Sequence, residues 1–338
     1  MNKVSPLLEA ASRLFAQLAV DCTGDFSAQW VQLREMGFTL LLVPEEQGGL
    51  GVGLTEAFAI ATAAGYHAVG LPVPECMIGQ AAFASVLSGS DQPLATVAFD
   101  ASCAISGDRC SGIVRSVPWG RYSERIAFAQ GGRNYLIRTR DAISSQQQQN
   151  PAGEPRDTFA FERAPVVAAA GPSVFSVAAL LRAGQIAGAL QAALEMSVRY
   201  ANERVQFGRS IGKFQVIQHN LAIFAEEVAA ARAAGEAAAR AAEIDGAEFE
   251  IAVAKCRANK AAAAGHATAH AVHGAIGFTM EYPLNHLTRR LLAWRSEFGN
   301  QRYWTRWIGA QSLQMASNGF WETLTERSDR VAAQHGDH

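Results

Sequence analysis

The spacing of hydrophobic residues changes twice along this chain and divides it into three parts. Residues 1–92 carry apolar side chains at helical spacing, as in the stretch from Leu7 to Ala19. Residues 93–168 are short β-rich runs separated by Gly, Ser and Asp. Residues 169–338 return to a helical pattern that is rich in alanine. This order predicts a mainly α protein with an N-terminal helical domain, a small central antiparallel β domain and a C-terminal four-helix bundle.

The first part predicts four helices, with a glycine-rich loop between the second and the third. Proline and three glycines between Val43 and Gly51 cannot occupy one helix interior. The helices are expected at Leu7–Ala19, Trp30–Met36, Leu54–Ala64 and Gly79–Leu87.

The second part predicts four short strands and a polar loop. The loop covers Ser144 to Gly153 and consists mainly of Ser, Gln, Asn and Gly. The strands are expected at Ala95–Phe99, Gly112–Val117, Arg125–Ala129 and Asn134–Arg138.

The third part predicts long helices with short connections, which make neighbouring helices antiparallel. Small alanine side chains also let such helices pack closely. The long helices are expected at residues 174–203, 215–242 and 247–273, with one or two further helices between 284 and 325.

Charge and cysteine content narrow the class of protein. The net charge is −2 and only 18% of the residues are charged, which argues against a nucleic-acid-binding protein. The five cysteines lack CxxC spacing, which favours reduced thiols in a cytoplasmic protein. We expect no signal peptide and no membrane span, because the N-terminus lacks an apolar core and no apolar run approaches about 20 residues.

The stretch from Arg204 to Gln215 concentrates polar chemistry between two alanine-rich helices. Arg204 offers a two-pronged donor for a phosphate or carboxylate. Gly208 allows a sharp turn or a close approach to a ligand. Gln206 and Gln215 can each donate and accept hydrogen bonds. A plain turn between helices needs only one glycine, so this stretch predicts a ligand site.

A second glycine-rich stretch runs from His273 to Pro283, where the last long helix ends. Gly274 and Gly277 fit either of two interpretations. They terminate the helix, which is common for glycine, or they form a backbone platform for a flat or phosphorylated ligand.

Together these stretches resemble the acyl-CoA dehydrogenase family, along almost the whole chain. The helix–sheet–helix order agrees, and the resemblance extends to the smaller subunit of heteromeric bacterial members. The matching elements are Trp30…Met36-Gly37, Val43-Pro-Glu-Glu-Gln-Gly-Gly-Leu-Gly51, Arg204-Val-Gln-Phe-Gly208…Phe214-Gln215, and His273-Gly-Ala-Ile-Gly-Phe278…Pro283…Arg289-Arg290.

The resemblance implies FAD as cofactor, bound at a subunit interface. The glycine loop would back the adenosine end of the cofactor through Gly274 and Gly277, although Ala275 stands where the family usually has glycine. The residues expected to contact the FAD of a neighbouring subunit are Arg204, Gln206, Phe207 and Gln215.

The resemblance also implies an acyl-CoA substrate, a role in fatty acid or lipid catabolism, and an electron-transfer flavoprotein as acceptor. In the family a glutamate removes the proton α to the thioester carbonyl, and flavin takes a hydride from the β carbon. Counting without gaps from Gly274 places Phe298 at the glutamate position and Glu297 one residue early. Glu297 is therefore either the base or a solvated or paired surface acid. The family's other base position falls near Ala178, where no carboxylate stands.

The β region departs from the family pattern, because the expected substrate loops are short. Trp119 is the aromatic candidate there, and it either stacks on the flavin or fills the core. His266, His270 and His273 share a helix face, but no acidic ligand accompanies them, so packing is favoured over a metal site.

Three functions follow from these observations. In the first, the chain is a self-sufficient acyl-CoA dehydrogenase that forms a homo-oligomer. In the second, it is a companion subunit that supplies in-trans FAD contacts in a hetero-oligomer. By analogy with heteromeric family members, the substrates of such a hetero-oligomer carry bulky acyl groups such as steroid side chains. The third is a helical scaffold without a cofactor, which the β region and the paired glycine motifs disfavour.

Overall fold

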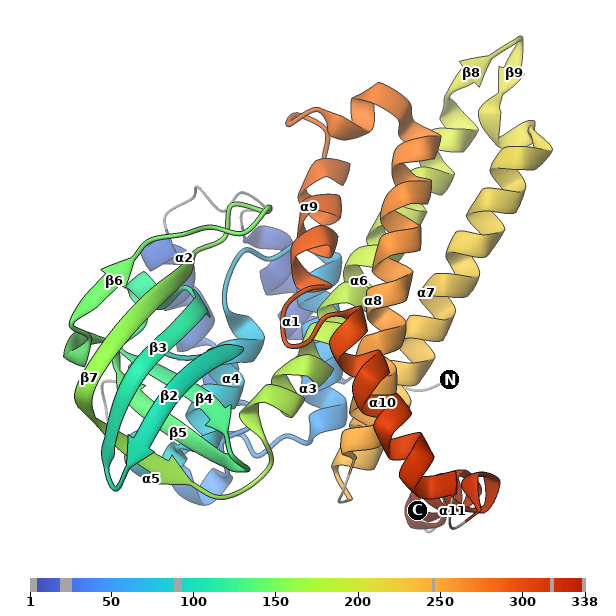
Figure 1. The fold of residues 1–338 in the computed structure, drawn as a ribbon. Coiled ribbons are helices and arrows are strands. Elements are labelled where there is room, and N and C mark those ends of the chain that lie inside the picture. The colour runs from blue at the N-terminus through green and yellow to red at the C-terminus, as the bar shows by residue number, and fades with distance from the viewer. Residues whose placement is uncertain (1–4, 19–25, 88–92, 245–246, 317–318, 336–338) are drawn as a thin grey trace.

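The chain folds into the three parts that the sequence predicts, as a computed structural model shows (Figure 1). The structure describes residues 5–18, 26–87, 93–244, 247–316 and 319–335. The β domain lies to one side, the long helices of the C-terminal part lie to the other, and the N-terminal helices pack between and behind them.

The N-terminal part consists of short helices that bury most of their apolar side chains. Ser5 caps the first helix by accepting a hydrogen bond from the Leu7 amide. The last predicted helix starts earlier than expected, at Val73, because Pro72 and Pro74 fit its first turn, and it breaks at Phe83. The helices are α1 (Pro6–Gln17), α2 (Phe26–Glu35), α3 (Leu54–Tyr66), α4 (Val73–Ala82) and α5 (Ala84–Leu87), with 3₁₀ turns at Phe38–Leu40 and Glu45–Gln47.

The β domain is a twisted sheet with the strand order β1-β4-β5-β7-β3-β2, in which β6 also pairs with β7. All pairs are antiparallel except β1 with β4. Strand β7 belongs to both halves of the sheet, and it bends between them near Arg163, which has φ of +46°. The strands are β1 (Ala95–Val97), β2 (Asp100–Ser106), β3 (Arg109–Pro118), β4 (Arg125–Gln130), β5 (Arg133–Arg138), β6 (Ser144–Gln146) and β7 (Arg156–Ala169).

The four predicted strands are present, but β2, β6 and β7 were not predicted. Strand β6 lies inside the segment expected to be a loop, and Gln149 makes a β-bridge with Pro155 at its end. The first residues of the 144–153 segment therefore belong to the sheet, and its last residues form a turn.

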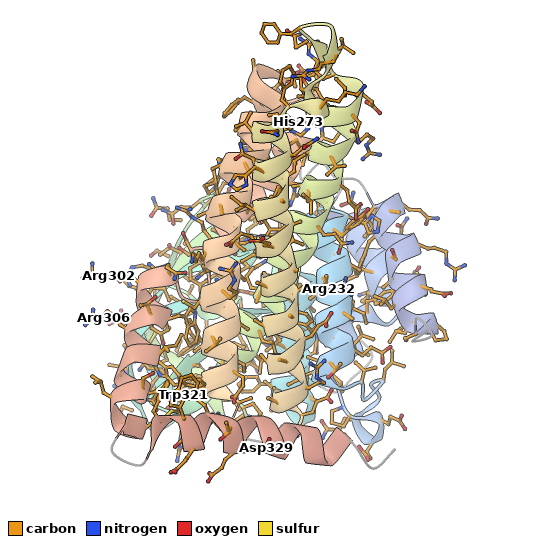
Figure 2. The ribbon with its side chains drawn as sticks, turned by 90° about the vertical axis from the view of Figure 1, so that its right-hand side faces the viewer. Arg232, His273, Arg302, Arg306, Trp321 and Asp329 are labelled. Atoms are coloured by element: carbon orange, nitrogen blue, oxygen red, sulfur yellow. The ribbon has the colours of Figure 1, made fainter. Side chains whose placement is uncertain are left out.

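The C-terminal part is a bundle of long helices, and the predicted ranges match closely. Helices α6 (Val174–Glu203), α7 (Gln215–Ala242) and α8 (Glu248–His273) run alongside one another (Figure 1). They are followed by α9 (Leu284–Trp294), α10 (Gln301–Ala316) and α11 (Phe320–His335). Helix α11 crosses the base of the bundle (Figure 2).

Helix α6 is the central helix of the fold. The sequence analysis expected no apolar run long enough to span a membrane, but the hydropathy and length of α6 would suit one. In the structure, 89% of its most apolar 18-residue window is buried inside the protein. A core helix has the same composition. Helix α3 crosses α6 very closely, and an added Cβ at Gly188 would lie 1.9 Å from the Thr62 carbonyl oxygen.

We predict that Gly188→Ala lowers the free energy of unfolding by about 1–3 kcal/mol, because the two backbones would have to move apart. Chemical denaturation measures the effect. The control is Ala229→Val on the exposed face of α7, which should change stability by about 0.5 kcal/mol. Equal effects for the two variants would contradict the close contact between α3 and α6.

Candidate functional site

A hairpin at the upper end of the bundle carries the first sequence motif. Strands β8 (Val205–Gln206) and β9 (Arg209–Ser210) pair across the two residues Phe207 and Gly208, which have φ of +52° and +77°. Two positive φ values are typical of a type I′ hairpin turn. The turn projects beyond the helices (Figure 1) and leaves the Phe207 side chain 92% exposed.

The polar side chains of this hairpin are available for an external ligand. The Arg204 and Gln215 side chains are exposed and have no hydrogen-bond partner among the described residues. Gln206 donates only to its neighbouring carbonyl, that of Val205, at 2.8 Å. The guanidinium of Arg209 lies 4.1 Å from the centre of the Phe214 ring and stiffens the hairpin.

The second motif lies at the same end of the bundle, where α8 ends (Figure 1, Figure 2). Residues Gly274–Phe278 form a 3₁₀ turn, and Gly274 has φ of +63°. Nothing lies within 4 Å of a Cβ added at Gly274 or Gly208, so both backbones present an open surface. Gly277 is buried against the His270 and His273 side chains.

The histidines of α8 form aromatic contacts that support this turn. The His270 ring stacks on Phe278 at 4.1 Å, and the His273 ring stacks on Tyr200 at 4.6 Å. Burial lowers the pKa of both histidines. Nδ1 of His273 lies 2.8 Å from the Ala269 carbonyl oxygen. These contacts explain the histidines by packing.

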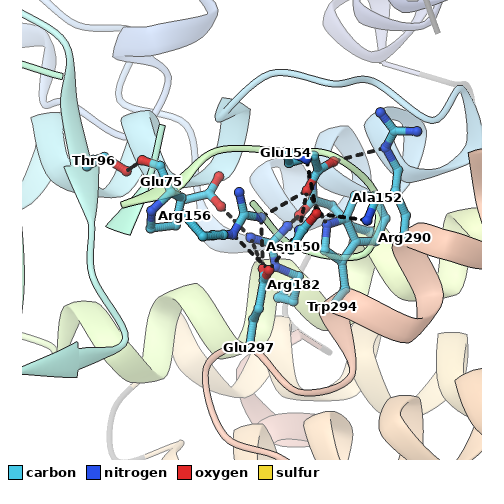
Figure 3. Close-up of polar contacts among 12 residues, drawn as sticks. Glu75, Thr96, Asn150, Ala152, Glu154, Arg156, Arg182, Arg290, Trp294 and Glu297 are labelled. Atoms are coloured by element: carbon cyan, nitrogen blue, oxygen red, sulfur yellow. Dashed lines mark hydrogen bonds and ion pairs between the residues drawn. The ribbon is translucent and has the colours of Figure 1, made fainter. Parts of the chain in front are cut away.

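The residue expected to act as base, Glu297, lies in a buried cluster of ion pairs (Figure 3). Its carboxylate accepts from Arg156 Nε at 2.8 Å and lies 3.0 Å from Arg182 Nη2. Asn150 donates to it at 3.1 Å. We call this group the charge cluster; it contains Glu75, Glu154, Glu297, Arg156, Arg182 and Arg290, all with side chains at most 5% exposed.

The charge cluster joins all three parts of the fold. Glu154 bridges the β domain to α9, with Arg156 at 2.9 Å and Arg290 at 3.0 Å. Arg182 of α6 pairs with Glu75 of α4 as well as with Glu297. Three carboxylates thus balance three guanidinium groups, which is how charge is tolerated in a protein interior.

This environment does not suit a general base. Burial alone would raise the pKa of Glu297, but the charges of Arg156 and Arg182 and the hydrogen bonds from Arg156 and Asn150 outweigh it and lower the pKa to about 2. A base that removes an α proton works best with a pKa near the operating pH. Glu297 is paired, as one of the two interpretations from the sequence has it, but it is buried and not at the surface.

Phe298 and Trp119 are buried as well. The Phe298 ring packs edge-on against Phe99 at 5.2 Å and is 1% exposed. Trp119 is 4% exposed, and the Arg156 guanidinium covers its ring at 4.8 Å. The other family base position, Ala178, is 2% exposed and carries no acid. These contacts are those of core residues.

A cavity of about 1070 Å³ lies beside the charge cluster, between the β domain and α10. Aromatic side chains form part of its wall, among them Phe175, Tyr303 and Trp304. Ser296 and Gly299 also line it, whereas Glu297 does not and lies within the charge cluster (Figure 3). The carboxylates among the lining residues are those of Asp100 and Glu248, which both lie on the exposed surface.

Lys255 holds the loop between α9 and α10 in this conformation. Its fully buried ammonium donates to Asn259 Oδ1 at 2.6 Å and to the carbonyl oxygens of Trp294 and Gly299 at 3.3 and 3.2 Å. Burial lowers its pKa well below the usual value.

The sequence analysis missed Arg182, which pairs with Glu297, and Glu75, which pairs with Arg182. A signal was present, because each is an isolated charge in an apolar run, and buried charges are almost always paired. The partners themselves were not visible, since they are far apart in the sequence.

Comparison with known proteins finds similarity both in the C-terminal part and along most of the chain. Residues 169–313 match the sequence model of the family "acyl-CoA dehydrogenase, C-terminal domain". The acyl-CoA dehydrogenase IpdE2 of Mycobacterium tuberculosis is 26% identical over 284 residues, which cover 80% of this chain and 81% of IpdE2.

Solved structures share the fold of the whole chain. One chain of the ChsE4–ChsE5 complex from Mycobacterium tuberculosis superimposes with a TM-score of 0.81 at 20% identity, covering 91% of this chain and 98% of that one. The Tcur3481–Tcur3483 steroid ACAD (acyl-CoA dehydrogenase) gives 0.83 at 22% identity, covering 92% and 98%. Residues 169–313 thus carry the C-terminal domain of an acyl-CoA dehydrogenase, and the chain as a whole is similar to proteins named acyl-CoA dehydrogenases.

We predict that Glu297→Gln lowers the free energy of unfolding by about 3–5 kcal/mol at neutral pH, because it leaves buried arginine charge without its partner. Denaturation followed by circular dichroism measures this. The control Glu236→Gln removes an exposed pair with Arg232 and should cost less than about 1 kcal/mol. A loss for Glu297→Gln as small as the control's would contradict the structural role of the cluster.

The depressed pKa of Glu297 also predicts how stability changes with pH. In the folded state the pKa of this carboxylate is about 2, whereas the ordinary pKa of a glutamate is 4.5. Its contribution is therefore complete above about pH 5 and is lost as the pH falls toward 2. Denaturation across this range should show a shallower loss for Glu297→Gln than for the unmodified chain, and parallel curves would argue against the ion pair.

Proposed function

We propose that this chain is the companion subunit of a two-chain acyl-CoA dehydrogenase. It supplies flavin contacts to a partner chain of the same fold, and the partner provides the catalytic base. The observation that carries the proposal is a contrast between the candidate FAD-contacting residues and the candidate base. The hairpin and glycine turn are exposed with free donors, whereas Glu297 is locked into the charge cluster.

The exposed end fits the negatively charged part of FAD. Arg204 offers a fork of donors for the pyrophosphate, and Gln206 and Gln215 offer amide groups beside it. Phe207 provides an exposed ring for packing, and the open backbone of Gly274, in the turn that the buried Gly277 supports, would back the adenosine end. Because these groups project outward from the bundle, they suit a flavin held mainly by another subunit (Figure 1).

The chain's own cavity lacks the group that would begin catalysis. FAD, when bound, supplies the acceptor for the hydride from the β carbon of an acyl-CoA. The α proton, however, must go to a carboxylate beside the thioester. Glu297 does not line the cavity, Phe298 fills the adjacent position, and Trp119 is covered by Arg156. The partner chain would therefore carry the base.

Two of the similar structures carry the names of two different chains, and one of them is named a steroid ACAD. Their resemblance supports a hetero-oligomer that oxidises a bulky, ring-bearing acyl-CoA and passes electrons to an electron-transfer flavoprotein. The free thiols at Cys76, Cys103, Cys110 and Cys256 suit a cytoplasmic protein.

Purification with and without a co-expressed homologue tests the proposal. We expect a colourless or flavin-poor chain alone, and a yellow, active complex with one flavin per pair of chains. Visible absorbance, mass and turnover of a panel of acyl-CoA thioesters, including ring-bearing ones, provide the measurements. Stoichiometric flavin and bleaching by an acyl-CoA in the chain alone would instead establish a self-sufficient enzyme.

In the complex we predict that Arg204→Ala and Gln215→Ala each weaken FAD retention by about tenfold to a hundredfold, the effect of losing a hydrogen bond to a charged group. The control is Arg34→Ala, an exposed arginine on α2. Fluorescence titration of released FAD measures the affinity. Flavin affinity equal to that of the control in both variants would remove these residues from the site.

A further inference from the structure

A second cavity, of about 640 Å³, lies between α1, α3 and α7. None of the described residues that line it belongs to the charge cluster, the hairpin or the glycine turn, so it is separate from the site described above. Pockets that bind small molecules commonly have volumes of about 300–1,000 Å³ and combine an apolar surface with a few polar groups. This cavity has both properties.

The cavity is a groove that follows the length of α3. Thr55 and Tyr66 mark its two ends on that helix, about 16 Å apart along the helix axis. Helix α7 ends where α3 begins, because Glu243 accepts a hydrogen bond from the Thr55 amide at 2.8 Å. Arg240 therefore lies at the Thr55 end of the groove. Figure 2 shows Arg232, two turns earlier, on the side of α7 nearest the N-terminal helices.

The floor of the groove is apolar and closely packed from below. A Cβ added at Gly235 or Gly184 would lie 2.2 or 3.1 Å from a ring atom of Phe58, so this ring is held between α7 and α6. Side chains packed at such density keep their positions. The groove is therefore a preformed apolar surface. Its apolar lining residues are Leu8, Phe58, Ala59 and Ala63.

Arg240 is a cation at this groove without a partner in the described ranges of the chain. It is half-buried, and its guanidinium makes no hydrogen bond or ion pair with any residue there. The nearby acids are engaged elsewhere, since Glu236 pairs with Arg232 at 2.7 Å and Glu243 caps α3. Glu9 is exposed in the first turn of α1, where the helix N-terminus stabilises its carboxylate. A half-buried guanidinium of this kind favours an anion from outside the chain.

The opposite end of the groove is polar but holds no unpaired charge. His67 Nε2 and Ser12 Oγ share a hydrogen bond of 3.0 Å, and burial lowers the pKa of His67, so its imidazole is uncharged at neutral pH. Tyr66 and Gln191 both donate to Glu195, at 2.6 and 3.1 Å. These groups satisfy one another, which leaves Arg240 to bind a charged ligand.

We propose that this groove binds an amphipathic anion, with a carboxylate or phosphate group on Arg240 and an apolar body along the floor. The planar guanidinium offers two parallel donors, which match the oxygens of either group. The apolar body covers Phe58 and the alanines of α3 and removes their surface from water, which favours binding. The groove lies apart from the hairpin and the charge cluster, so this site does not depend on the companion role proposed above.

Calorimetric titration of the purified protein, with whatever chain and flavin copurify, tests the proposal. The probes are decanoate, decyl phosphate, decanol and inorganic phosphate. We expect saturable binding of the two amphipathic anions, about tenfold weaker binding of decanol, and no binding of inorganic phosphate. The affinities of decanoate and decyl phosphate identify the head group that the site prefers. Equal affinity for decanol and both anions would overturn the anion site.

Two substitutions locate the binding in the groove. Arg240→Gln removes the charge and should weaken decanoate binding about tenfold to a hundredfold, the effect of losing hydrogen bonds to a charged group. Ala59→Leu narrows the groove without changing its charge, and it should weaken binding by about tenfold while thermal unfolding stays the same. The matched controls are Arg34→Gln on α2 and Ala233→Leu on α7, both at exposed positions, which should leave the affinity unchanged.

The same titrations can refute the site. Decanoate affinity that neither Arg240→Gln nor Ala59→Leu lowers would assign the binding to another cavity and overturn the proposal. The absence of saturable binding for both anions would overturn it as well. An equal loss of affinity in Arg34→Gln and Arg240→Gln would indicate a general effect of charge and would also contradict a specific site at Arg240.

Discussion

The three-way pairing of Glu297 with Arg156 and Arg182 is the contact on which the rest of the structure depends. It ties the β domain, the core helix α6 and the α9–α10 loop to one point in the interior. Because a buried charge must keep its partners, the ion pairs hold this loop in place, and Lys255 binds the same loop through the carbonyl oxygens of Trp294 and Gly299. The carboxylate is thereby held in the charge cluster and does not line the neighbouring cavity.

Local sequence patterns predicted the helical part of this fold well. Helices α6, α7 and α8 follow the expected ranges almost residue for residue, since their alanine content and capping positions are local properties. Strand β2 escaped prediction because Ala and Ser dominate its sequence, and β7 because charged residues, alanines and a proline interrupt its apolar residues. Their strand conformation comes from pairing with β3, which is a property of the sheet.

Only part of the candidate site could be predicted from the sequence. The hairpin residues from Arg204 to Gln215 lie within one short stretch, so the sequence could place them together. The charge cluster joins residues far apart along the chain: Arg182 is 107 residues from Glu75, and Arg156 is 141 residues from Glu297. An isolated arginine in an apolar helix indicates that an acidic partner exists, but only the packed structure identifies it.

The balance of charge in the cluster also restricts how this protein can evolve. Three acids and three bases share their hydrogen bonds, so the effect of changing one depends on the other five. A single substitution leaves an unpaired ion in the core, whereas a matched pair of substitutions can be neutral. An acidic residue at position 298 would therefore require coordinated replacement of its charged neighbours. Such epistasis restricts the single substitutions that the interior of this chain can accept.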